Sequence, residues 1–420
     1  MKTCALLAAF IASVVASAYL RLIFTLPVIS LGLFVLLWPL INRDKLSKPI
    51  LLSLINTGAV LLCAGLSVTL FNALEAFRST TPSTRRIYTA DYGTPRTEGA
   101  WLSGSSEPLG YRYKEGLSPM RSRLIEQETG KVIYDVTYSF NDNGLRKTFD
   151  KGANTSNTAL FLGGSFTFGE GLDDNESLPS QFSQLTGWKS INAGMHGYGS
   201  HQALQALRDN PTYSRITGGS GIDLVVYRVM NDHANRADGM SDWDKYGPCF
   251  NLTPRGVVEY QGTFSECKKR LSISSALRNA LNFLTKTKEP FSRILLKRLN
   301  NTLFREQAEK RQIAIITEMQ RLSKSRSSQL VVVIENLISP HNNTRADKGA
   351  GCHMDSRMNL LASELVKRGI ATVIISDITS DAECSSGRLS IPNDGHPSGY
   401  ANKKVAHALA KSLITIGTGF

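Results

Sequence analysis

Residues 158–171 read TALFLGGSFTFGEG, and the sequence after them repeats the pattern that this stretch begins. Thr158 to Leu162 is a short apolar run that favours a buried strand, and a glycine-rich turn follows it. A helix is expected near Ser177 to Leu185. Glycines in such a turn permit a tight bend and let a substrate approach the backbone. A strand that passes through a turn into a helix is typical of parallel sheets.

The same alternation of strands and helices continues to the C-terminus. Further strand candidates are Lys189 to Asn192, Ile222 to Val229, Gln329 to Glu335 and Ile370 to Ser376, and further helix candidates are His201 to Arg208, Asp355 to Arg368 and Tyr400 to Ile414. This alternation predicts an α/β domain over residues 158–420, with three α/β/α layers and a mainly parallel, flavodoxin-like sheet. Reactive groups gather at the carboxyl ends of the strands in such sheets.

Chemically useful side chains follow several of these strands. Ser165 lies in the first turn, and the second strand ends in NAGMHGYG (residues 192–199). The third strand ends in Asn-Asp-His (residues 231–233), and NDGHPS (residues 393–398) opens the last helix. A serine nucleophile needs a histidine to take its proton, and a carboxylate to orient that histidine. Backbone and amide N–H groups can stabilise the oxyanion that forms. The set is what acyl transfer requires.

With these four blocks in this order, the chain resembles the SGNH (GDSL-like) hydrolase superfamily over roughly Thr158 to Ile414. The GGSFTFGEG block looks closer to membrane-anchored bacterial members than to secreted lipases. The resemblance implies that Ser165 is the nucleophile and that His396 is the general base, oriented by Asp394.

The resemblance also implies an oxyanion hole made by the N–H groups of Ser165 and Gly197 and by the side chain of Asn231. Two positions depart from the family pattern. Gly164 stands where the family has aspartate before the serine, and Asp394 stands two residues before the histidine rather than three. The missing aspartate is not a triad member, so activity is still expected.

Other polar residues are candidates for lining the pocket, namely Gly164, His196, Asp232 and His233. His196, His201 and His233 match no standard zinc spacing, and no lysine follows the glycines as in a phosphate-binding loop. We therefore expect neither a metal nor a cofactor.

The first 77 residues resemble a membrane region. Three runs lack charged residues, Ala5 to Leu20, Leu22 to Ile41 and Ile50 to Leu70. A helix of about 20 residues crosses the hydrocarbon core of a bilayer, so two to three membrane helices are predicted. The first run also resembles a secretory signal, with a cleavage site at residues 16–18 (ASA).

The loop between the second and third runs predicts the orientation. It carries Arg43, Lys45 and Lys48 against one aspartate, and positively charged loops stay in the cytoplasm. The third helix would then lead outward, so everything after about Phe77 is expected in the periplasm of a bacterium, behind a multi-pass inner-membrane anchor.

Cysteine usage fits an oxidising compartment. Four cysteines lie beyond the apolar runs, and proximity in sequence favours the pairs Cys249–Cys267 and Cys352–Cys384. Four unpaired thiols are the alternative.

Residues 78–157 are predicted to form a small β-rich lead-in to the main domain. Within it, Lys131 to Phe140 alternates as a strand does, and NDNG (residues 141–144) suggests a hairpin turn.

Positive charge is concentrated in one insertion. The chain has 420 residues and a net charge of +13, while Lys268 to Arg326 holds 15 Lys and Arg against 4 Asp and Glu. This stretch belongs to a long insertion, about residues 231–328, with amphipathic helices expected to break near Pro290. Such helices suit anionic lipid headgroups or an acidic glycan, or they cover the sheet. Aromatic residues are sparse there, so nucleic acid is not an expected partner.

The sequence thus predicts a membrane-anchored serine ester hydrolase that acts on O-acyl groups of an envelope polysaccharide or lipid. An O-acyltransferase and a catalytically silent scaffold in envelope assembly are the alternatives. Protein partners do not follow from the sequence.

Overall fold

The chain forms two compact units in a computed structural model. One unit comprises residues 1–83 and 271–306, and the other comprises residues 84–270 and 307–420. The structure describes residues 29, 31–35, 37–38, 47–78, 86–88, 101–126, 129–149, 156–269, 290–338 and 353–415.

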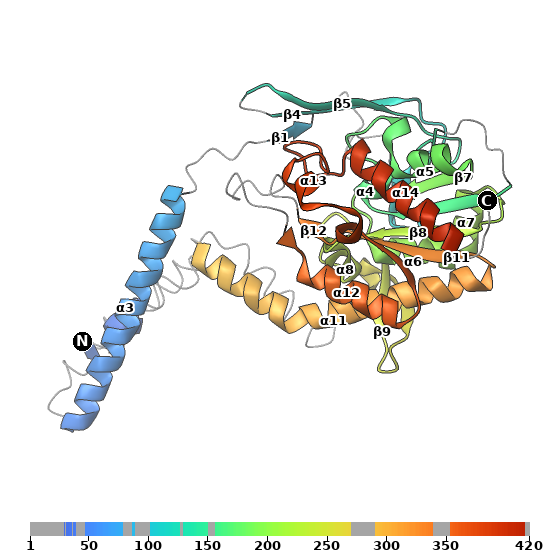
Figure 1. Ribbon diagram of the computed structural model, residues 1–420. Helices are drawn as coiled ribbons and strands as arrows, with labels where there is room; N and C mark the ends of the chain where they lie inside the picture. Colours follow the sequence, from blue (N-terminus) through green and yellow to red (C-terminus); the bar gives the residue numbers. More distant parts are fainter. Residues whose placement is uncertain are drawn as a thin grey trace. The chain divides into compact units, whose positions relative to one another are not determined.

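A five-stranded parallel sheet forms the centre of the second unit (Figure 1). Its strands are β6 (Thr158–Gly163), β7 (Lys189–Gly194), β8 (Leu224–Val229), β11 (Gln329–Ile334) and β14 (Ala371–Ile374). They lie in the order β14-β11-β8-β6-β7, and every neighbouring pair is parallel. In chain order this is 2-1-3-4-5, the flavodoxin-like arrangement, so the predicted fold class is confirmed for this sheet. The strand order reverses between β6 and β8, where such sheets place their ligands.

Both faces of the sheet are buried, which is why its middle strands β8 and β11 are largely apolar. Ala159 and Phe161 of β6 point to one face, and Leu160 and Leu162 point to the other. The first face is covered by α5 (Leu178–Thr186) and α14 (Gly399–Thr415), which lie side by side in Figure 1. The second is covered by α6 (Ser200–Arg208), α7 (Asn210–Thr217), part of α11 (Pro290–Ser325) and α12 (Ser356–Lys367).

Short helices complete this unit at the ends of the strands and in the connections. They are α4 (Ser165–Phe168), α8 (Asp232–Ala237), α9 (Phe264–Lys269), α13 (Asp381–Ser385) and the 3₁₀ helices η2 (Asp174–Glu176) and η4 (Ile375–Ile378). The long predicted helices begin and end within about two residues of their expected bounds, since capping signals mark them. For example, the Ser177 side chain caps α5, and Gly187 ends it in a left-handed conformation.

The β-rich lead-in packs against the same core as the sheet. Strands β1 (Arg86–Tyr88), β4 (Met120–Glu126) and β5 (Val132–Tyr138) form an antiparallel sheet, and β2 (Trp101–Ser103) pairs with β3 (Tyr111–Tyr113). Tyr113 and Phe140 lie in one buried cluster with Phe168, which follows β6. The predicted turn at residues 141–144 closes with a hydrogen bond from Gly144 N–H to Asn141 O.

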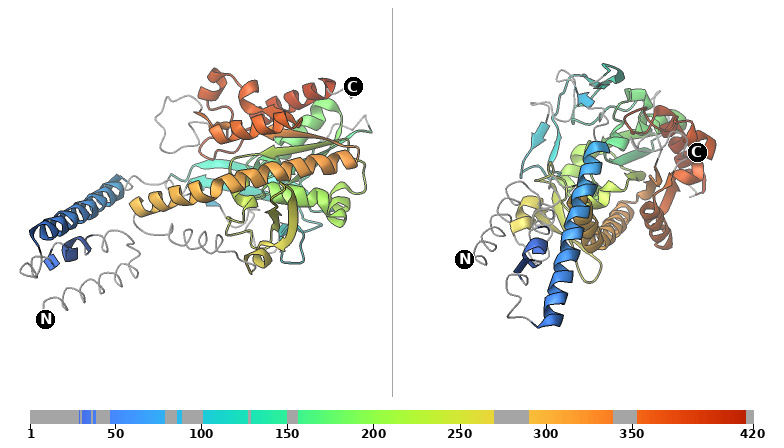
Figure 2. Two further views of the ribbon diagram at one scale, coloured as in Figure 1. Left: turned by 90° about the horizontal axis from the view of Figure 1, so that it is seen from below. Right: turned by 90° about the vertical axis from the view of Figure 1, so that its left-hand side faces the viewer.

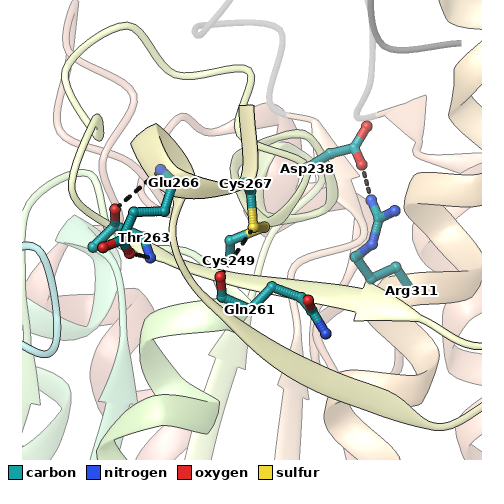
Figure 3. The surroundings of a disulfide bond; sticks show 7 residues. All are labelled: Asp238, Cys249, Gln261, Thr263, Glu266, Cys267 and Arg311. Atoms are coloured by element: carbon teal, nitrogen blue, oxygen red, sulfur yellow. Dashed lines mark hydrogen bonds and ion pairs between the residues drawn. A yellow bond between two sulfur atoms is a disulfide. The ribbon is translucent and has the colours of Figure 1, made fainter. Parts of the chain in front are cut away.

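The insertion after β8 contains a hairpin that the sequence did not predict. Strand β9 (Pro248–Leu252) pairs with β10 (Val258–Thr263), and a disulfide joins Cys249 to Cys267 in α9 (Figure 3). Beside it Asp238 forms an ion pair with Arg311 of α11. Cys384 is also disulfide-bonded, while Cys352 lies outside the described residues.

Helix α11 begins where the sequence predicts a break between helices, at Pro290. The helix begins at Pro290 and runs for 36 residues, because proline is tolerated in the first turn, where its missing N–H has no helical partner. Ile315, Ile316 and Met319 are fully buried against the sheet, and this part of α11 runs along the sheet in Figure 2. The C-terminal part of the basic stretch therefore covers the sheet. Residues 270–289 lie outside the described part.

The N-terminal region is described mainly through α3 (Lys48–Arg78). Residues 50–69 of this helix make it, among the described residues, the one long and apolar enough to cross a membrane, judged by length and composition alone. The predicted run Ala5 to Leu20, with its signal-like site, and most of Leu22 to Ile41 lie outside the described residues. Within the described residues the structure thus supports one such helix of the predicted two to three.

Candidate active site

Ser165 is the first residue of α4, directly after β6 and at the point where the strand order of the sheet reverses. Its N–H belongs to the first turn of a helix, where N–H groups have no intrahelical partner. Gly163, two residues earlier, has a φ of 151°, and a Cβ there would lie 2.3 Å from Thr167 Oγ1. Only glycine suits this backbone conformation, and the turn presents Ser165 at the end of the sheet.

Two buried arginines hold the turn that carries Ser165. Arg146 from the lead-in donates from Nη1 to the carbonyl oxygens of Phe168 and Gly169, at 2.8 and 2.5 Å. It also donates from Nη2 to Leu172 O at 2.5 Å. On the other side Arg228 of β8 donates to Phe166 O at 3.3 Å.

Arg228 is itself fixed by two further partners. Its guanidinium pairs with Glu335 after β11 and donates to Asn402 Oδ1 of α14 at 2.7 Å. The network therefore ties the turn that carries Ser165 to the middle strands of the sheet and to the last helix.

The loop at residues 390–397 brings a histidine and an aspartate to this turn. His396 Nε2 lies 2.9 Å from Ser165 Oγ, and His396 Nδ1 lies 2.5 Å from Asp394 Oδ2. Asn393, which occupies the position of the usual family acid, is exposed and has a left-handed φ of 62°. Asn393 therefore makes the turn, and the carboxylate that reaches the histidine belongs to Asp394.

A second carboxylate lies on the opposite side of the histidine ring. Glu170 Oε2 is 3.2 Å from His396 Nε2, the same nitrogen that faces Ser165. Burial disfavours the imidazolium, but Glu170 and Asp394 together outweigh burial and raise the pKa of His396 to about 10. The resting histidine is therefore a cation between two carboxylates at neutral pH.

His196 lies on the other side of Glu170. Its Nε2 is 3.4 Å from Glu170 Oε2, and its Nδ1 is 3.3 Å from the hydroxyl oxygen of Tyr113. Burial, with a smaller contribution from the charge on His396, lowers the pKa of His196 to about 4 despite the nearby Glu170 carboxylate. His196 is thus neutral while His396 is charged, although the two rings share a carboxylate.

The expected oxyanion-hole residues lie at the ends of β7 and β8. Gly197 has a φ of 75°, and a Cβ there would lie 2.7 Å from Trp243 Nε1 and from the Tyr111 hydroxyl oxygen. Asn231 follows β8, and its Nδ2 donates to Asp355 Oδ2 at 3.0 Å. An amide nitrogen carries two hydrogens, so this bond fixes the amide while the second N–H stays available.

The other sequence candidates have different surroundings. A Cβ on Gly164 would lie 3.1 Å from His233 Nε2 and 3.3 Å from Arg236 Nη1. These side chains occupy the space that the family's aspartate would need, which gives a physical reason for glycine. His233 is buried, and its Nδ1 is 2.8 Å from the hydroxyl oxygen of Tyr227. Asp232, in contrast, is exposed at the start of α8.

An exposed tryptophan lies beside the oxyanion glycine. Trp243 is 57% exposed, although its indole nitrogen approaches Gly197. The Arg236 guanidinium lies 5.9 Å from the centre of its ring and donates to Tyr198 O at 2.9 Å. A large apolar ring is thereby held at the edge of the site with much of its surface in solvent.

Sequence reasoning missed several residues that shape the site, above all Glu170, Arg146, Arg228, Asp355 and Trp243. Glu170 could have been suspected, because one helical turn after Ser165 returns the chain to it. Gly169 N–H and Glu170 N–H both donate to Ser165 O, at 2.8 and 3.1 Å. The others come from distant segments, and no local pattern distinguishes them from surface residues.

Comparisons with known proteins give distant likenesses. No family model and no curated protein matches the chain. Several solved structures that resemble it are described as GDSL-type or SGNH hydrolases.

A GDSL-like lipase from Bacteroides thetaiotaomicron is 12% identical, with 63% of this chain and 92% of that chain covered and a TM-score of 0.31. TesA is 12% identical over 61% of this chain and 98% of its own, with a TM-score of 0.34. A Desulfitobacterium hafniense protein assigned to the G-D-S-L lipolytic family is 12% identical over 60% and 98%, with a TM-score of 0.33. At such TM-scores the likeness does not bear on what this chain does.

Proposed function

We propose that the chain is a membrane-anchored serine ester hydrolase of the SGNH type. It acts outside the cytoplasm on O-acyl groups of an envelope polysaccharide or lipid. The observation that carries the proposal is the continuous contact from Ser165 Oγ through both ring nitrogens of His396 to Asp394. This contact lies at the switch point of a 2-1-3-4-5 sheet.

The proposed acylation step uses each of these groups. The step requires the minor fraction of His396 that is neutral below its raised pKa. Its Nε2 accepts the Ser165 proton while the serine oxygen attacks the ester carbonyl carbon. Asp394 keeps the histidine proton on Nδ1 and stabilises the imidazolium that forms. The N–H groups of Ser165 and Gly197 and the Asn231 amide stabilise the oxyanion. The alcohol leaves with the proton from His396, and the acyl group stays on Ser165.

Trp243 supports a sugar as the alcohol part of the ester. Sugar rings pack their C–H faces on exposed indole rings, and the Arg236 guanidinium beside Trp243 offers hydrogen bonds to hydroxyl or carboxylate substituents. A ring seated there would place an ester near the oxyanion glycine, because the indole approaches Gly197.

The external location is supported by the uncharged run of α3 and by the basic residues before it. Residues 50–69 are long enough to cross a bilayer, and the preceding loop is predicted to stay in the cytoplasm. The Cys249–Cys267 disulfide fits an oxidising compartment. Anionic headgroups or an acidic glycan remain the proposed partners of the basic stretch Lys268 to Arg326, in its part before residue 307.

Labelling with a fluorophosphonate, which reacts covalently with activated serines, tests the proposal. We expect labelling of the wild type, none of Ser165→Ala, and at least about a hundredfold slower labelling of His396→Ala. An unlabelled but folded wild-type protein would contradict the hydrolase proposal and favour the scaffold.

An acyltransferase is separated from a hydrolase by turnover of an acetylated sugar with and without a glycan acceptor. Hydrolysis predicts acetate as the product in both cases. Transfer predicts an acetylated acceptor in place of acetate.

A further inference from the structure

We propose that Glu170 and His196 hold a water molecule against His396 and so provide the nucleophile that releases the acyl group from Ser165. The inference rests on the proposed function, because it requires an acyl group on Ser165. It assigns a role to two buried side chains that the acylation step does not use.

His396 Nε2 faces two oxygen atoms. Ser165 Oγ and Glu170 Oε2 lie 2.9 and 3.2 Å from this one nitrogen. Once Ser165 is acylated, its oxygen has no proton to donate, and the histidine has given its own proton to the departing alcohol. A neutral Nε2 with a lone pair then faces a carboxylate oxygen, and two acceptors side by side need a donor between them.

A water molecule is the donor that fits this pair. It has two hydrogens, one for His396 Nε2 and one for Glu170 Oε2. One of its lone pairs accepts from His196 Nε2–H, and the other is free to attack the acyl carbon. An alcohol has a single hydroxyl proton and satisfies only one of the two acceptors. The pair of acceptors therefore favours hydrolysis over transfer to an alcohol.

The buried His196 side chain also has unmet hydrogen bonding. This side chain is 5% exposed, and within the described part of the chain its Nε2 has no hydrogen-bond partner. With Nδ1 accepting from the Tyr113 hydroxyl, Nε2 carries the ring proton and points toward Glu170 Oε2, 3.4 Å away. A buried donor without a partner in a polar site indicates a place for bound water.

Several elements fix this arrangement. Glu170 is 8% exposed and follows α4 in the same turn as Ser165. His196 follows β7, and its ring packs on Phe168 with centroids 4.2 Å apart. Arg146 binds the carbonyls of Phe168 and Gly169 just before Glu170. The carboxylate is therefore held by the backbone turn and need not move between the two halves of the reaction.

The proposed release step balances as follows. The water oxygen attacks the acyl carbon, and a water proton passes to His396 Nε2. The tetrahedral intermediate then collapses, the bond from the carbon to Ser165 Oγ breaks, and His396 returns the proton to Ser165. The products are a carboxylic acid and the free enzyme. Glu170 takes no proton, so it is a positioning residue.

Burst kinetics with p-nitrophenyl acetate separate the two halves of the reaction. In Glu170→Gln we expect a burst no slower than in the wild type, while steady-state turnover falls about tenfold or more. Intact-protein mass spectrometry should show acetyl-enzyme accumulating. Removing a negative charge beside His396 favours its neutral form, so the burst at neutral pH should become faster. Glu364→Gln, the same change on the exposed side of α12, should alter neither phase.

Partitioning between water and methanol gives a second readout that a purely structural role would not move. The wild type should favour water, and Glu170→Gln should yield a larger share of methyl acetate. Glu170→Asp should restore part of the steady-state rate. Equal slowing, or equal acceleration, of burst and turnover in Glu170→Gln would overturn the water site. It would show that Glu170 acts only through His396.

If the chain is not a serine hydrolase, the experiment gives a different result. In that case the wild type itself would show no burst and no acetyl group on Ser165. A wild-type burst with an unchanged ratio of the two phases in Glu170→Gln contradicts the water site alone.

Discussion

Two segments meet at the site, and they are held in place in different ways. They are the nucleophile turn (residues 163–172) and the base loop (residues 390–397). The nucleophile turn is held by residues that are distant from it in the sequence, Arg146 of the lead-in and Arg228 of β8. The Tyr138 hydroxyl also accepts from Gly171 N–H at 2.9 Å.

The base loop is held largely by its own backbone. Ile391 N–H donates to His396 O at 2.8 Å, and Asp394 N–H donates to Ile391 O at 3.1 Å. The carboxylate of Asp394 is buried, whereas Asn393 at the tip is exposed. We conclude that the position of the nucleophile depends on the whole fold. The position of the base depends mainly on a local turn, so mutations in the two segments should have different signatures.

The largest effect is expected for Arg146→Met. The substitution removes the guanidinium that donates to the carbonyls of Phe168, Gly169 and Leu172, and it breaks the ion pair with Asp174. We expect the free energy of unfolding to fall by about 3–5 kcal/mol, with labelling of Ser165 lost as well. Urea denaturation followed by tryptophan fluorescence measures the change.

Arg121→Met is the matched control, since Arg121 is an exposed arginine whose partner is Asp135. Its cost should stay below about 1 kcal/mol. If both substitutions lower the free energy of unfolding equally, Arg146 does not hold the nucleophile turn as the contacts indicate.

Raising the pH above neutral is expected to have a large effect on the rate of Ser165 labelling while the fold stays intact. The form of His396 that can accept a proton is the neutral one, and its pKa is raised to about 10. Fluorophosphonate labelling should therefore speed up by about tenfold per pH unit above neutral and level off near pH 10. Asp394→Asn removes one of the carboxylates that stabilise the imidazolium, so its profile should level off at a lower pH and at a lower rate.

The raised pKa also predicts how stability changes. Protonated His396 stabilises the folded chain below about pH 6.5, and this contribution is lost as the pH rises toward 10. A labelling profile that levels off near pH 6.5 would mean that the two carboxylates do not act on His396 as the geometry indicates.

The smallest effect is expected for Asn393→Ala. The left-handed φ of 62° costs alanine about 1 kcal/mol more than glycine, while asparagine tolerates it. We expect activity to fall a few-fold and Tm to change little, because the tip is exposed. Asn393→Gly should keep wild-type activity. A large loss of Tm with both variants would show that the base loop supports the fold as the nucleophile turn does.

Much of the fold followed from the sequence because its signals are local. Continuous apolar runs such as Ile222 to Val229 predict strands buried on both faces, and capping residues mark where the helices begin. The hairpin β9–β10 was missed because its short strands, PCFNL and VEYQGT, lack a strong alternating pattern. Helix α11 begins at Pro290, where the sequence predicts a break, because proline suits the first turn of a helix.

The residues of the site likewise divide into those with a local sequence signal and those without one. Ser165, Asp394 and His396 stand in short blocks with glycines around them, so the sequence could single them out. Arg146 and Asp355 reach the site only through tertiary packing, 19 residues before and 190 after Ser165. A charged residue in a polar stretch carries no local sign that it becomes buried.

The contact of Arg146 with the nucleophile turn also sets the smallest piece of this chain that can be useful in isolation. A fragment cut at Thr158, where the parallel sheet begins, would keep every residue of the triad. It would lose the guanidinium that binds the Ser165 turn and the aromatic rings of Tyr113 and Tyr138 that cover Phe168. Such a fragment should misfold and aggregate. A fragment that begins near Trp101 keeps that guanidinium and those rings, so it should fold and be labelled at Ser165 as the full-length chain is.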